Sequence, residues 1–462
     1  MDLVFLSLIL LAFVVFFFIL KRSKDRNLNL PPGPPRLPII GNLHQMATGD
    51  PLPHRALRDL ANQYGPLMYL QLGEVTTIVV SSPEYAKEVT TTHDLIFASR
   101  PHVPAAKILS YNYTDIAFAP YGPYWRQLRK ICVMELLSPK TSPVFPTTFG
   151  NKTKDIELFQ VVIAEATKMF AGSNIADMFP SITFLQSVTG LKAKIERMHQ
   201  KTDRILTNII DEHKVRRASG KSQKVEDLVD VLLNLQESGN LESPMTGENV
   251  KAVIMDVFSA GTETSATTVD WTMSELMRNP KVMKKAQAEV REVFNRRGKV
   301  DEAGLEEMQY LKLIIKETLR LRPSAPMLFP RECAETCNIN GYDIPAKANV
   351  LVNVWAMTRD PKYWTEPDSY IPERFLDSSI DFKGTNYEYI PFGSGRRMCP
   401  GMTYASANIE LPLAMLLYHF DWILPNGMKP EEMDMTEGFG VTVRRKQDLC
   451  LIPIPYQPSP VE

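Results

Sequence analysis

Cys399 has the clearest chemical setting of the five cysteines, in the turn-rich stretch from Phe392 to Gly401. An apolar helical pattern from Met402 to Phe420 follows directly, so Cys399 lies just before a predicted helix N-terminus. Backbone N–H groups and the positive end of the helix dipole would lower the pKa of its thiol, and the glycines let the backbone approach a flat cofactor closely. A buried structural role is the commoner fate of a single cysteine, but this loop favours a thiolate that binds a soft metal ion.

The other cysteines give weaker signals. Cys333 and Cys337 form a C-x3-C pair that could indicate zinc, but nothing nearby in the sequence completes a set of four ligands. Five cysteines in 462 residues are far fewer than disulfide-rich secreted domains use, and the number is odd. We therefore expect the folded body to lie in a reducing compartment.

The longest helical pattern runs from Asn249 to Arg278 and stops at the Asn-Pro dipeptide that follows. A helix of this length spans roughly 45 Å, and apolar residues on all its sides predict that it is buried. Its middle contains the polar run AGTETS at residues 260–265, where a glycine weakens the helix and hydroxyl groups compete for its backbone hydrogen bonds. A polar surface stripe would explain such a run in an ordinary helix, but the apolar residues before it make that explanation less fitting here.

A second helical pattern, from Leu305 to Arg322, is ended by a proline and places Glu317 and Arg320 three residues apart on one face. Pairs of this kind are common and weak on exposed helices. The segment PERF at residues 372–375 is equally uninformative when it is taken alone.

The elements that must position these groups are mostly helical. Short β-rich runs at residues 67–80 and 338–354 interrupt a helical sequence, so the predicted fold class is mainly α with small β-sheets. No flexible linker or repeat divides residues 39–462, which we predict to form a single domain. A net charge of −1, without any run of five or six like charges, argues against a nucleic-acid partner.

The N-terminus predicts a membrane anchor. Residues 3–20 are eighteen positions without a charge, which is near the lower limit for a transmembrane helix. Four Lys or Arg residues and one Asp follow at residues 21–26, so the positive-inside rule places the body in the cytosol. A cleaved secretory signal is the alternative, but its apolar core would be unusually long and no cleavage site follows. We expect a signal anchor at residues 1–20 and a basic, proline-rich hinge at residues 21–38.

The stretch around Cys399, residues 392–401, matches the F-x-x-G-x-R-x-C-x-G signature of the cytochrome P450 family. Residues 260–264 resemble the oxygen-activation motif of that family's long central helix. Glu317 and Arg320 resemble its E-x-x-R pair, and Arg374 resembles the arginine that joins them; these three would be structural. Residues 31–38 resemble the hinge of microsomal members, and the motifs occur in family order over nearly the whole chain. The sequence most resembles plant A-type enzymes of the seventy-one clan, especially the terpenoid- and alkaloid-oxidising branches.

The resemblance implies a haem b cofactor whose iron is bound by the Cys399 thiolate. It also implies that Gly261 opens the central helix above the haem, and that Thr264, with Glu263, delivers protons during oxygen activation. Guanidinium groups suit the haem propionates geometrically. The further residues expected at the haem are Arg397, Trp125 and Arg129 at the propionates, Arg331 as a weaker candidate there, and Phe392, Gly395 and Gly401 in the Cys399 loop.

The same resemblance implies a monooxygenase of the endoplasmic reticulum membrane, with a single span and its catalytic domain facing the cytosol. Electrons would come from NADPH through NADPH-cytochrome P450 reductase, with cytochrome b5 as an additional partner besides membrane lipid. The substrate would be a small lipophilic plant metabolite, a terpenoid first and an alkaloid next. Substrate contacts are expected from residues 100–120, the central helix before Thr264, and residues 324–329 and 436–441. Residues 174–181 lie where the family places a roof helix.

One stretch departs from the family pattern. Only 24 positions separate Trp125 from the Phe-Gly dipeptide at residues 149–150, where relatives carry a much longer segment with a further helix. Three prolines between residues 139 and 146 forbid a continuous helix there. We therefore expect the domain to be shortened near residues 138–150. The alternative function is a non-catalytic shortened isoform that folds poorly or binds partners without turnover; haem-dependent rearrangement without a reductase is disfavoured by Thr264.

Overall fold

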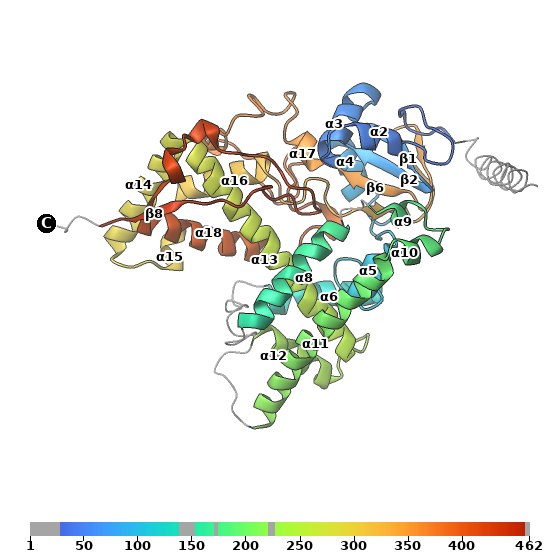
Figure 1. Ribbon diagram of the computed structural model, residues 1–462, viewed down its shortest axis with the longest axis horizontal. Coiled ribbons are helices and arrows are strands. Elements are labelled where there is room, and N and C mark those ends of the chain that lie inside the picture. The colour runs from blue at the N-terminus through green and yellow to red at the C-terminus, as the bar shows by residue number, and fades with distance from the viewer. Residues whose placement is uncertain (1–27, 138–152, 171–173, 220–226, 458–462) are drawn as a thin grey trace, which may run out of the picture.

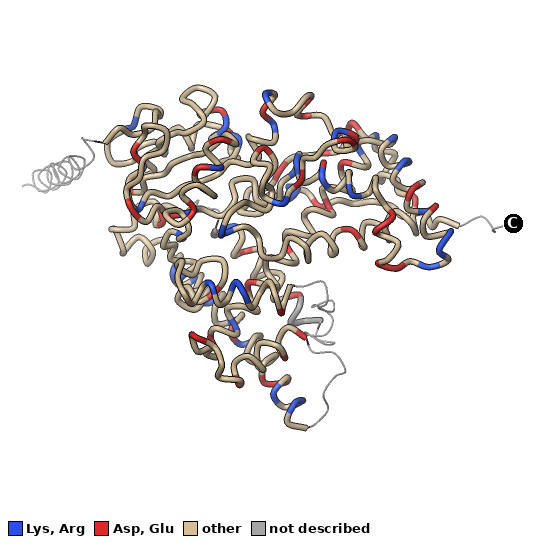
Figure 2. Tube along the Cα trace, turned by 180° about the vertical axis from the view of Figure 1, so that it is seen from behind, with Lys and Arg blue, Asp and Glu red and all other residues tan. Residues whose placement is uncertain are grey.

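The computed structural model describes residues 28–137, 153–170, 174–219 and 227–457 (Figure 1). The predicted anchor at residues 1–20 and the stretch predicted to be shortened, near residues 138–150, lie outside these ranges. Within the described ranges, no helix combines the length and the apolar character needed to cross a membrane. The body is mainly helical with small sheets, as predicted, and its basic and acidic residues are interspersed along the trace (Figure 2).

The largest sheet has four strands in the order β1-β2-β6-β3, and it lies at one end of the body (Figure 1). β1 and β2 form an antiparallel hairpin, and β6 runs parallel to β2, with Thr77 opposite Asn349. Both predicted β-rich runs therefore contain strands. The strand bounds are β1 (Leu67–Leu72), β2 (Val75–Val80), β3 (Arg331–Glu332), β4 (Cys337–Ile339), β5 (Tyr342–Ile344), β6 (Asn349–Val352), β7 (Phe420–Ile423) and β8 (Ile452–Pro455).

Helices build the remainder of the body. The α-helices are α2 (Leu43–Thr48), α3 (Pro53–Tyr64), α4 (Pro83–Lys87), α5 (Pro104–Leu109), α6 (Pro123–Ile131), α8 (Thr153–Phe170), α9 (Ile175–Met178), α10 (Phe184–Val188), α11 (Leu191–Ala218), α12 (Leu228–Ser238), α13 (Gly247–Arg278), α14 (Pro280–Arg297), α15 (Glu302–Leu305), α16 (Gln309–Leu321), α17 (Val354–Met357) and α18 (Met402–His419). Short π or 3-10 turns are η1 (Glu88–Thr92), η2 (Cys132–Leu136), η3 (Pro372–Phe375), η4 (Gly395–Arg397), η5 (Pro425–Gly427) and η6 (Pro430–Glu432).

α13 is the predicted central helix, and it runs through the middle of the body (Figure 1). Its first turn is closed by a reciprocal cap, in which the side chains of Thr246 and Asn249 each accept the other's backbone N–H. The N-terminal half packs in an apolar cluster with α11 and α12, and the C-terminal half packs with α14, α16 and α18. α13 therefore joins two separate parts of the core, and side chains along it are fixed relative to both.

The predicted helix from Leu305 to Arg322 is wrong at its start, because the structure has a short α15 and then α16 from Gln309. The carboxylate of Glu289, on α14, accepts the backbone N–H groups of Tyr310 at 2.7 Å and Leu311 at 2.9 Å. A side chain from another helix thus satisfies the first turn of α16. The local pattern of apolar residues does not reveal a cap of this kind.

The proline-rich residues 31–38 lie extended against β1. The backbone N–H of Tyr69 donates to the carbonyl of Pro32 at 2.9 Å, and Nδ2 of Asn42 donates to the carbonyl of Pro34 at 3.2 Å. A Cβ atom at Gly33 would lie 2.1 Å from the carbonyl oxygen of Tyr69, so only glycine allows this close approach. The described part of the predicted hinge is thus packed on the body.

Candidate active site

The loop before α18 holds Cys399 in a fixed position. Its backbone N–H donates to the carbonyl of Phe392 at 2.9 Å, which closes the loop on itself. Gly393 and Gly395 have positive φ angles of 76° and 70°, and a Cβ atom at Gly395 would lie 1.7 Å from the carbonyl oxygen of Thr90 on η1. The predicted loop immediately before a helix N-terminus is confirmed, and its glycines serve the loop's turns and its contact with η1.

The pKa of the Cys399 thiol differs from the sequence prediction. Burial raises the pKa, whereas the backbone N–H of Gly401 and the charge of Arg129 lower it by less, so the pKa lies above its ordinary value. The free energy lost when the thiolate is removed from water is larger than the stabilisation that these two groups give it. The expected depression by the helix N-terminus is therefore wrong for the protein alone. A bound metal ion would still deprotonate the thiol on coordination.

A single cavity brings together most of the predicted site residues. It lies between the Cys399 loop and α13, and Gly395 is the predicted residue that does not line it. All four stretches expected to contact substrate contribute to its wall, whereas residues 174–181 do not and instead pack on the β1–β2 turn. The predicted site residues that line the cavity are Trp125, Arg129, Gly261, Glu263, Thr264, Arg331, Phe392, Arg397, Cys399 and Gly401.

Buried arginines are concentrated on one side of this cavity. Burial lowers the pKa of Arg397 to about 9 and that of Arg331 to about 10, and the charge of Arg331 lowers the pKa of Arg397 further. Arg100, which the sequence analysis did not single out, lies half-buried beside them, and its pKa is lowered by burial and by the charges of Arg397 and Arg331. Clustered buried cations of this kind are costly unless anions lie among them.

The donors of these arginines show what the cluster could bind. Arg397 donates to the carbonyls of Ala98 and Ala119, both at 2.5 Å, and its guanidinium lies 4.2 Å from the centre of the Trp125 ring. Arg331 donates through Nη2 to the carbonyl of Ser394 at 2.9 Å, while its buried Nη1 has no partner among the described residues. One or two carboxylates would satisfy this charge and this orphaned donor, so the cavity fits the propionate groups of a haem.

The two other predicted propionate ligands, Trp125 and Arg129, also bond backbone carbonyls, as Arg397 does. The indole N–H of Trp125 donates to the carbonyl of Ile116 at 3.0 Å, and Nη1 of Arg129 donates to the carbonyl of Met398. Both side chains line the cavity but support its wall through these bonds. The structure therefore places them beside the candidate haem site, with Arg129 holding the residue next to Cys399.

Four of the six residues in the polar run of α13, including Thr264, line the same cavity, and the run does not interrupt the helix. Thr264 Oγ1 donates to the carbonyl of Ala260 at 2.7 Å, and the carbonyl of Thr264 accepts the hydroxyl of Ser324 at 3.3 Å. Residues 247–278 are α-helical throughout, so Gly261 does not open the helix. A Cβ atom at Gly261 would have its nearest neighbour 4.0 Å away, on the Tyr404 ring. Glycine here leaves space in the cavity wall rather than a break in the backbone.

A pair of carboxyl groups, on buried Asp115 and half-buried Asp256, was missed by the sequence analysis. Asp256, on α13, accepts the backbone N–H groups of Ile116 at 2.7 Å and Ala117 at 3.0 Å, so it ties the loop after α5 to α13. Burial raises the pKa of Asp256 to about 6; burial and the neighbouring Asp256 raise that of Asp115. Asp256 is a lone carboxylate in an apolar run, which was the available signal.

The E-x-x-R residues lie outside the cavity in the core. Arg320 donates to both carboxylate oxygens of Glu317, at 2.7 and 2.9 Å, and Arg374 donates to Glu317 at 3.0 Å. Neither Glu317 nor Arg320 has any exposed side-chain surface. The structure thus joins the three residues that the sequence analysis assigned to the scaffold.

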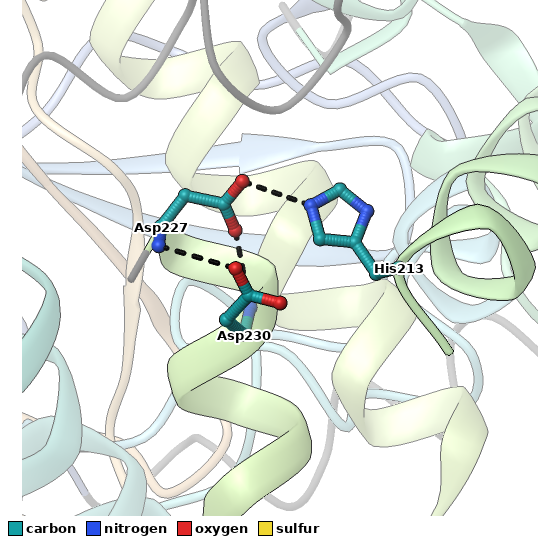
Figure 3. A group of neighbouring side chains, drawn as sticks. All are labelled: His213, Asp227 and Asp230. Carbon is teal, nitrogen blue, oxygen red and sulfur yellow. Dashed lines mark hydrogen bonds and ion pairs between the residues drawn. The ribbon is translucent and has the colours of Figure 1, made fainter. Parts of the chain in front are cut away.

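A second polar cluster, made by His213, Asp227 and Asp230, was also not anticipated (Figure 3). Within the described residues it is the only group of three or more potential metal ligands, so Cys333 and Cys337 gain no further ligand there. His213 Nε2 bonds Asp227 at 2.8 Å, Arg216 donates to Asp230 at 2.9 Å, and the two aspartates cap the first turn of α12. These contacts already balance the charges, which makes the cluster a joint between α11 and α12.

The bond between His213 and Asp227 should make the stability of the protein depend on pH. Burial lowers the pKa of His213, but its bond to Asp227 outweighs burial and leaves the pKa raised. The stabilisation is therefore complete below the unfolded pKa of about 6.5 and is lost as the pH rises through the higher folded pKa. His213→Ala should reduce the free energy of unfolding by about 1–3 kcal/mol at pH 6, because Asp227 loses its partner.

Urea unfolding of the original chain and of His213→Ala, between pH 6 and pH 9, measures this effect. The difference between the two chains should shrink as the pH rises. His199→Ala is the matched control, because the pKa of His199 is lowered by burial and its pH dependence has the opposite sign. A difference for His213→Ala that stays constant over this range would contradict the assignment.

Comparisons with known proteins agree with the cavity. The sequence model of the cytochrome P450 family matches residues 31–148 and 141–451. Tabersonine 16-hydroxylase 2 of Catharanthus roseus is 50% identical, with 97% of each chain covered, and premnaspirodiene oxygenase of Hyoscyamus muticus is 49% identical, with 98% of this chain and 99% of the relative covered. A zebra fish cytochrome P450 solved with abiraterone is 26% identical, with a TM-score of 0.66 over 87% of this chain and 99% of that chain.

The alignments also show a difference in length. The alignment with tabersonine 16-hydroxylase 2 extends over 499 positions, whereas 97% of this 462-residue chain is about 448 residues. About 50 aligned positions therefore have no residue in this chain. The two segments matched by the family model meet at residues 141–148.

Proposed function

The chain belongs to the cytochrome P450 family, among the plant A-type enzymes of the seventy-one clan, and from this premise we propose that it oxidises a lipophilic plant specialised metabolite. The proposed reaction inserts one oxygen atom of O2, using electrons that derive from NADPH. The observation that carries the proposal is the convergence of the Cys399 thiol, the buried arginines and the Thr264 side of α13 on one cavity.

Cys399 would bind the iron of haem b, and Arg331 with Arg397 and Arg100 would bind its propionates. When bound, the haem supplies the redox chemistry that activates O2. The Cys399 loop holds the thiol at a fixed place through its bond to Phe392, while Arg129 holds the neighbouring carbonyl of Met398. These residues fix the position and the electronic surroundings of the metal ligand.

The proposed substrate is lipophilic, a terpenoid first and an alkaloid next. The apolar wall of the cavity is the support for a lipophilic substrate. Premnaspirodiene oxygenase and tabersonine 16-hydroxylase 2 are the relatives whose names point to these two classes. A wall of this kind binds apolar molecules through burial and leaves orientation to a few polar groups. The apolar side chains in the wall include Leu109, Ile116, Phe118, Ile163, Val257 and Phe329.

Location and partners are part of the same proposal. Residues 1–20 would anchor the chain in the endoplasmic reticulum membrane, and the basic residues after them would keep the domain in the cytosol. NADPH-cytochrome P450 reductase would supply electrons there, with cytochrome b5 as an additional partner. The support for this topology is the apolar run and the charges that follow it.

Thr264→Ala should leave haem binding intact but uncouple NADPH use from product formation. Thr264 Oγ1 is a hydroxyl at the cavity wall that can hold a proton next to the reacting centre, and half-buried Glu263 lines the same cavity. We expect product formed per NADPH to fall about tenfold or more. Thr262→Ala is the matched control, since Thr262 bonds the carbonyl of Phe258 in the same way but does not line the cavity. Full coupling in Thr264→Ala would disprove the proton-holding role.

The proposed function is tested first without any substrate. The chain is expressed in microsomes with a reductase, and the CO difference spectrum of the dithionite-reduced protein is recorded. A thiolate-type Soret band supports the proposal, and spectral titration with terpenoids and alkaloids then identifies the substrate class. Absence of the band from well-expressed protein favours the non-catalytic shortened isoform, for which the roughly 50 aligned positions without a counterpart are the supporting observation.

A further inference from the structure

The side chains of Cys333 and Cys337 meet at a corner of the small sheets, outside the cavity. Cys333 directly follows β3, and Cys337 begins β4. Cys337 is paired with Ile344 across the β4–β5 hairpin, and Sγ of Cys333 lies 3.9 Å from the carbonyl oxygen of the same Ile344. Cys337 packs on the apolar cluster that contains Cys333, and a hydrogen bond joins the two thiols. The fold therefore brings two sulfur atoms together that the proposed reaction does not use.

The two thiols differ in accessibility and in reactivity. Cys333 is fully buried, whereas Cys337 is half-buried and can meet small solutes. The hydrogen bond between the thiols raises the pKa of Cys333 and lowers that of Cys337. Oxidants react with the thiolate form of cysteine, and exposure increases the rate. Cys337 is thus the thiol that an oxidant reaches first, with Cys333 beside it as a second thiol.

The connection between the two cysteines can adjust to a covalent bond. Residues 334–336 are exposed and belong to neither a helix nor a strand. Glu335 brings its carbonyl oxygen to 2.9 Å from Sγ of Cys333, so the connection folds back over this sulfur. The backbone of Cys333 is held by bonds to Ala348 at 2.9 Å and from Lys347 at 2.7 Å. Because a disulfide requires a specific geometry, the small movements that form it would fall on the exposed connection.

A pair of thiols without further ligands is suited to redox chemistry rather than to a metal ion. Structural zinc sites almost always have four ligands, and within the described residues neither Cys333 nor Cys337 belongs to a group of three potential ligands. The body is expected in a reducing compartment, where disulfides are usually transient and respond to oxidants. The geometry therefore favours a bond that forms and breaks over a permanent one.

We propose that Cys333 and Cys337 form a reversible disulfide when hydrogen peroxide oxidises Cys337. The Cys337 thiolate and a proton react with the peroxide to give a sulfenic acid and one water molecule. The Cys333 thiol then attacks this sulfur, the S–S bond forms, and a second water molecule leaves. In total the two thiols lose two electrons and two hydrogen atoms, and one peroxide becomes two water molecules.

Reduction of the disulfide needs a dithiol, which regenerates both cysteines by thiol–disulfide exchange. Neither cysteine lines the cavity, so the proposal goes beyond the proposed function and does not depend on turnover.

Mass spectrometry tests the proposal on a single peptide. Trypsin cleavage after Arg331 and Lys347 releases residues 332–347, which contain both cysteines and no others. The full-length haem-loaded chain is treated with hydrogen peroxide and unfolded, and its remaining thiols are blocked with N-ethylmaleimide. We expect most of this peptide to be unblocked and lighter than the dithiol by two hydrogen atoms, and dithiothreitol should restore two blockable thiols.

Two results would overturn the proposal. The first is a peptide that keeps two blockable thiols while exposed Cys450 is oxidised. The second is a peptide in which Cys337 stops at sulfinic acid or is cross-linked to another chain. Damage to the haem by peroxide would not imitate the expected result, because it neither changes the mass of this peptide nor is reversed by dithiothreitol.

Single variants identify the role of each thiol. Cys333→Ser removes the second thiol, so the sulfenic acid of Cys337 should accumulate and its labelling by dimedone should rise about fivefold or more. Cys337→Ser should leave buried Cys333 unoxidised. Cys450→Ser is the matched control and should form the disulfide as fully as the original chain. Circular dichroism verifies that each variant is folded. Equal dimedone labelling of Cys337 in the original chain and in Cys333→Ser would show that Cys333 does not complete the bond.

Discussion

Cys399→Ala should abolish both turnover and the thiolate-type CO difference band, while the protein remains folded. The thiolate of Cys399 is the strong iron ligand that the loop before α18 offers. Alanine leaves no ligand in its place. The loop itself should survive, because it is closed by the backbone bond from Cys399 to Phe392, which alanine retains. Expression, far-ultraviolet circular dichroism and the CO spectrum of variant and original chain measure the effect.

Cys132 provides the sharper control for this prediction. Its side chain also lines the cavity, so a sulfur ligand from η2 is the competing assignment. Burial and the charge of Asp256 raise the pKa of Cys132 to about 12, and its thiol is therefore a poor source of thiolate. Cys132→Ala should retain the band, and exposed Cys450→Ala should do so too. A Cys399→Ala variant that keeps both band and turnover would show that the iron ligand has been wrongly assigned.

Glu317→Gln should destabilise the fold more than any other single substitution of a charged residue considered for this chain. Arg320 is completely buried, and among the described residues the only carboxylate to which it donates, through two bonds, is that of Glu317. Removing one partner of a buried ion pair typically costs about 3–5 kcal/mol, since the remaining charge is left without compensation. Such a loss is a large fraction of the roughly 5–15 kcal/mol by which domains are stable.

The consequences should extend to the segment around η3. Glu317 also accepts the backbone N–H of Ile371 at 2.8 Å and a bond from Arg374, both through Oε1, so both attachments of this segment are weakened when the carboxylate charge is removed. Urea unfolding and the yield of haem-loaded protein measure the effect. Glu307→Gln is the control, because Glu307 pairs with Arg296 and Arg297 at the surface, where such pairs are worth about 0–1 kcal/mol. Equal losses for the two variants would contradict a structural role for the buried cluster.

The prediction of Cys399 as the metal ligand and the prediction of the central helix both followed from local sequence. The spacing around Cys399 and the turn residues near it indicate a loop before a helix, and this depends only on neighbours in the chain. The end of α13 at Arg278 could be predicted for the same reason, because the following Asn-Pro dipeptide acts on the residues next to it. Features that depend only on neighbouring residues in the sequence could therefore be predicted.

The charge environments of the site residues could not be predicted from the sequence, because they arise from segments that are distant along the chain. Burial of Cys399 raises its pKa, although its position before a helix suggested the opposite. Asp256 reaches the loop at Ile116 across 140 positions of sequence, and Arg331 contacts the carbonyl of Ser394 across 63. Desolvation depends on everything that surrounds a group, so a local pattern does not contain it.

The sequence by itself therefore determined the family, the prediction of Cys399 as the iron ligand and the polar run on α13, since each is carried by residues at short spacing. Tertiary structure decided which of those residues share a cavity, that Arg100 and Asp256 belong beside them, and that Gly395 serves the loop outside the cavity. It also decided where apolar surface stays uncovered, because the exposure of α18 depends on which helices lie against it. Sequence spacing determines which side chains lie on each face of a helix. Only the packing of the tertiary structure determines which elements contact that face.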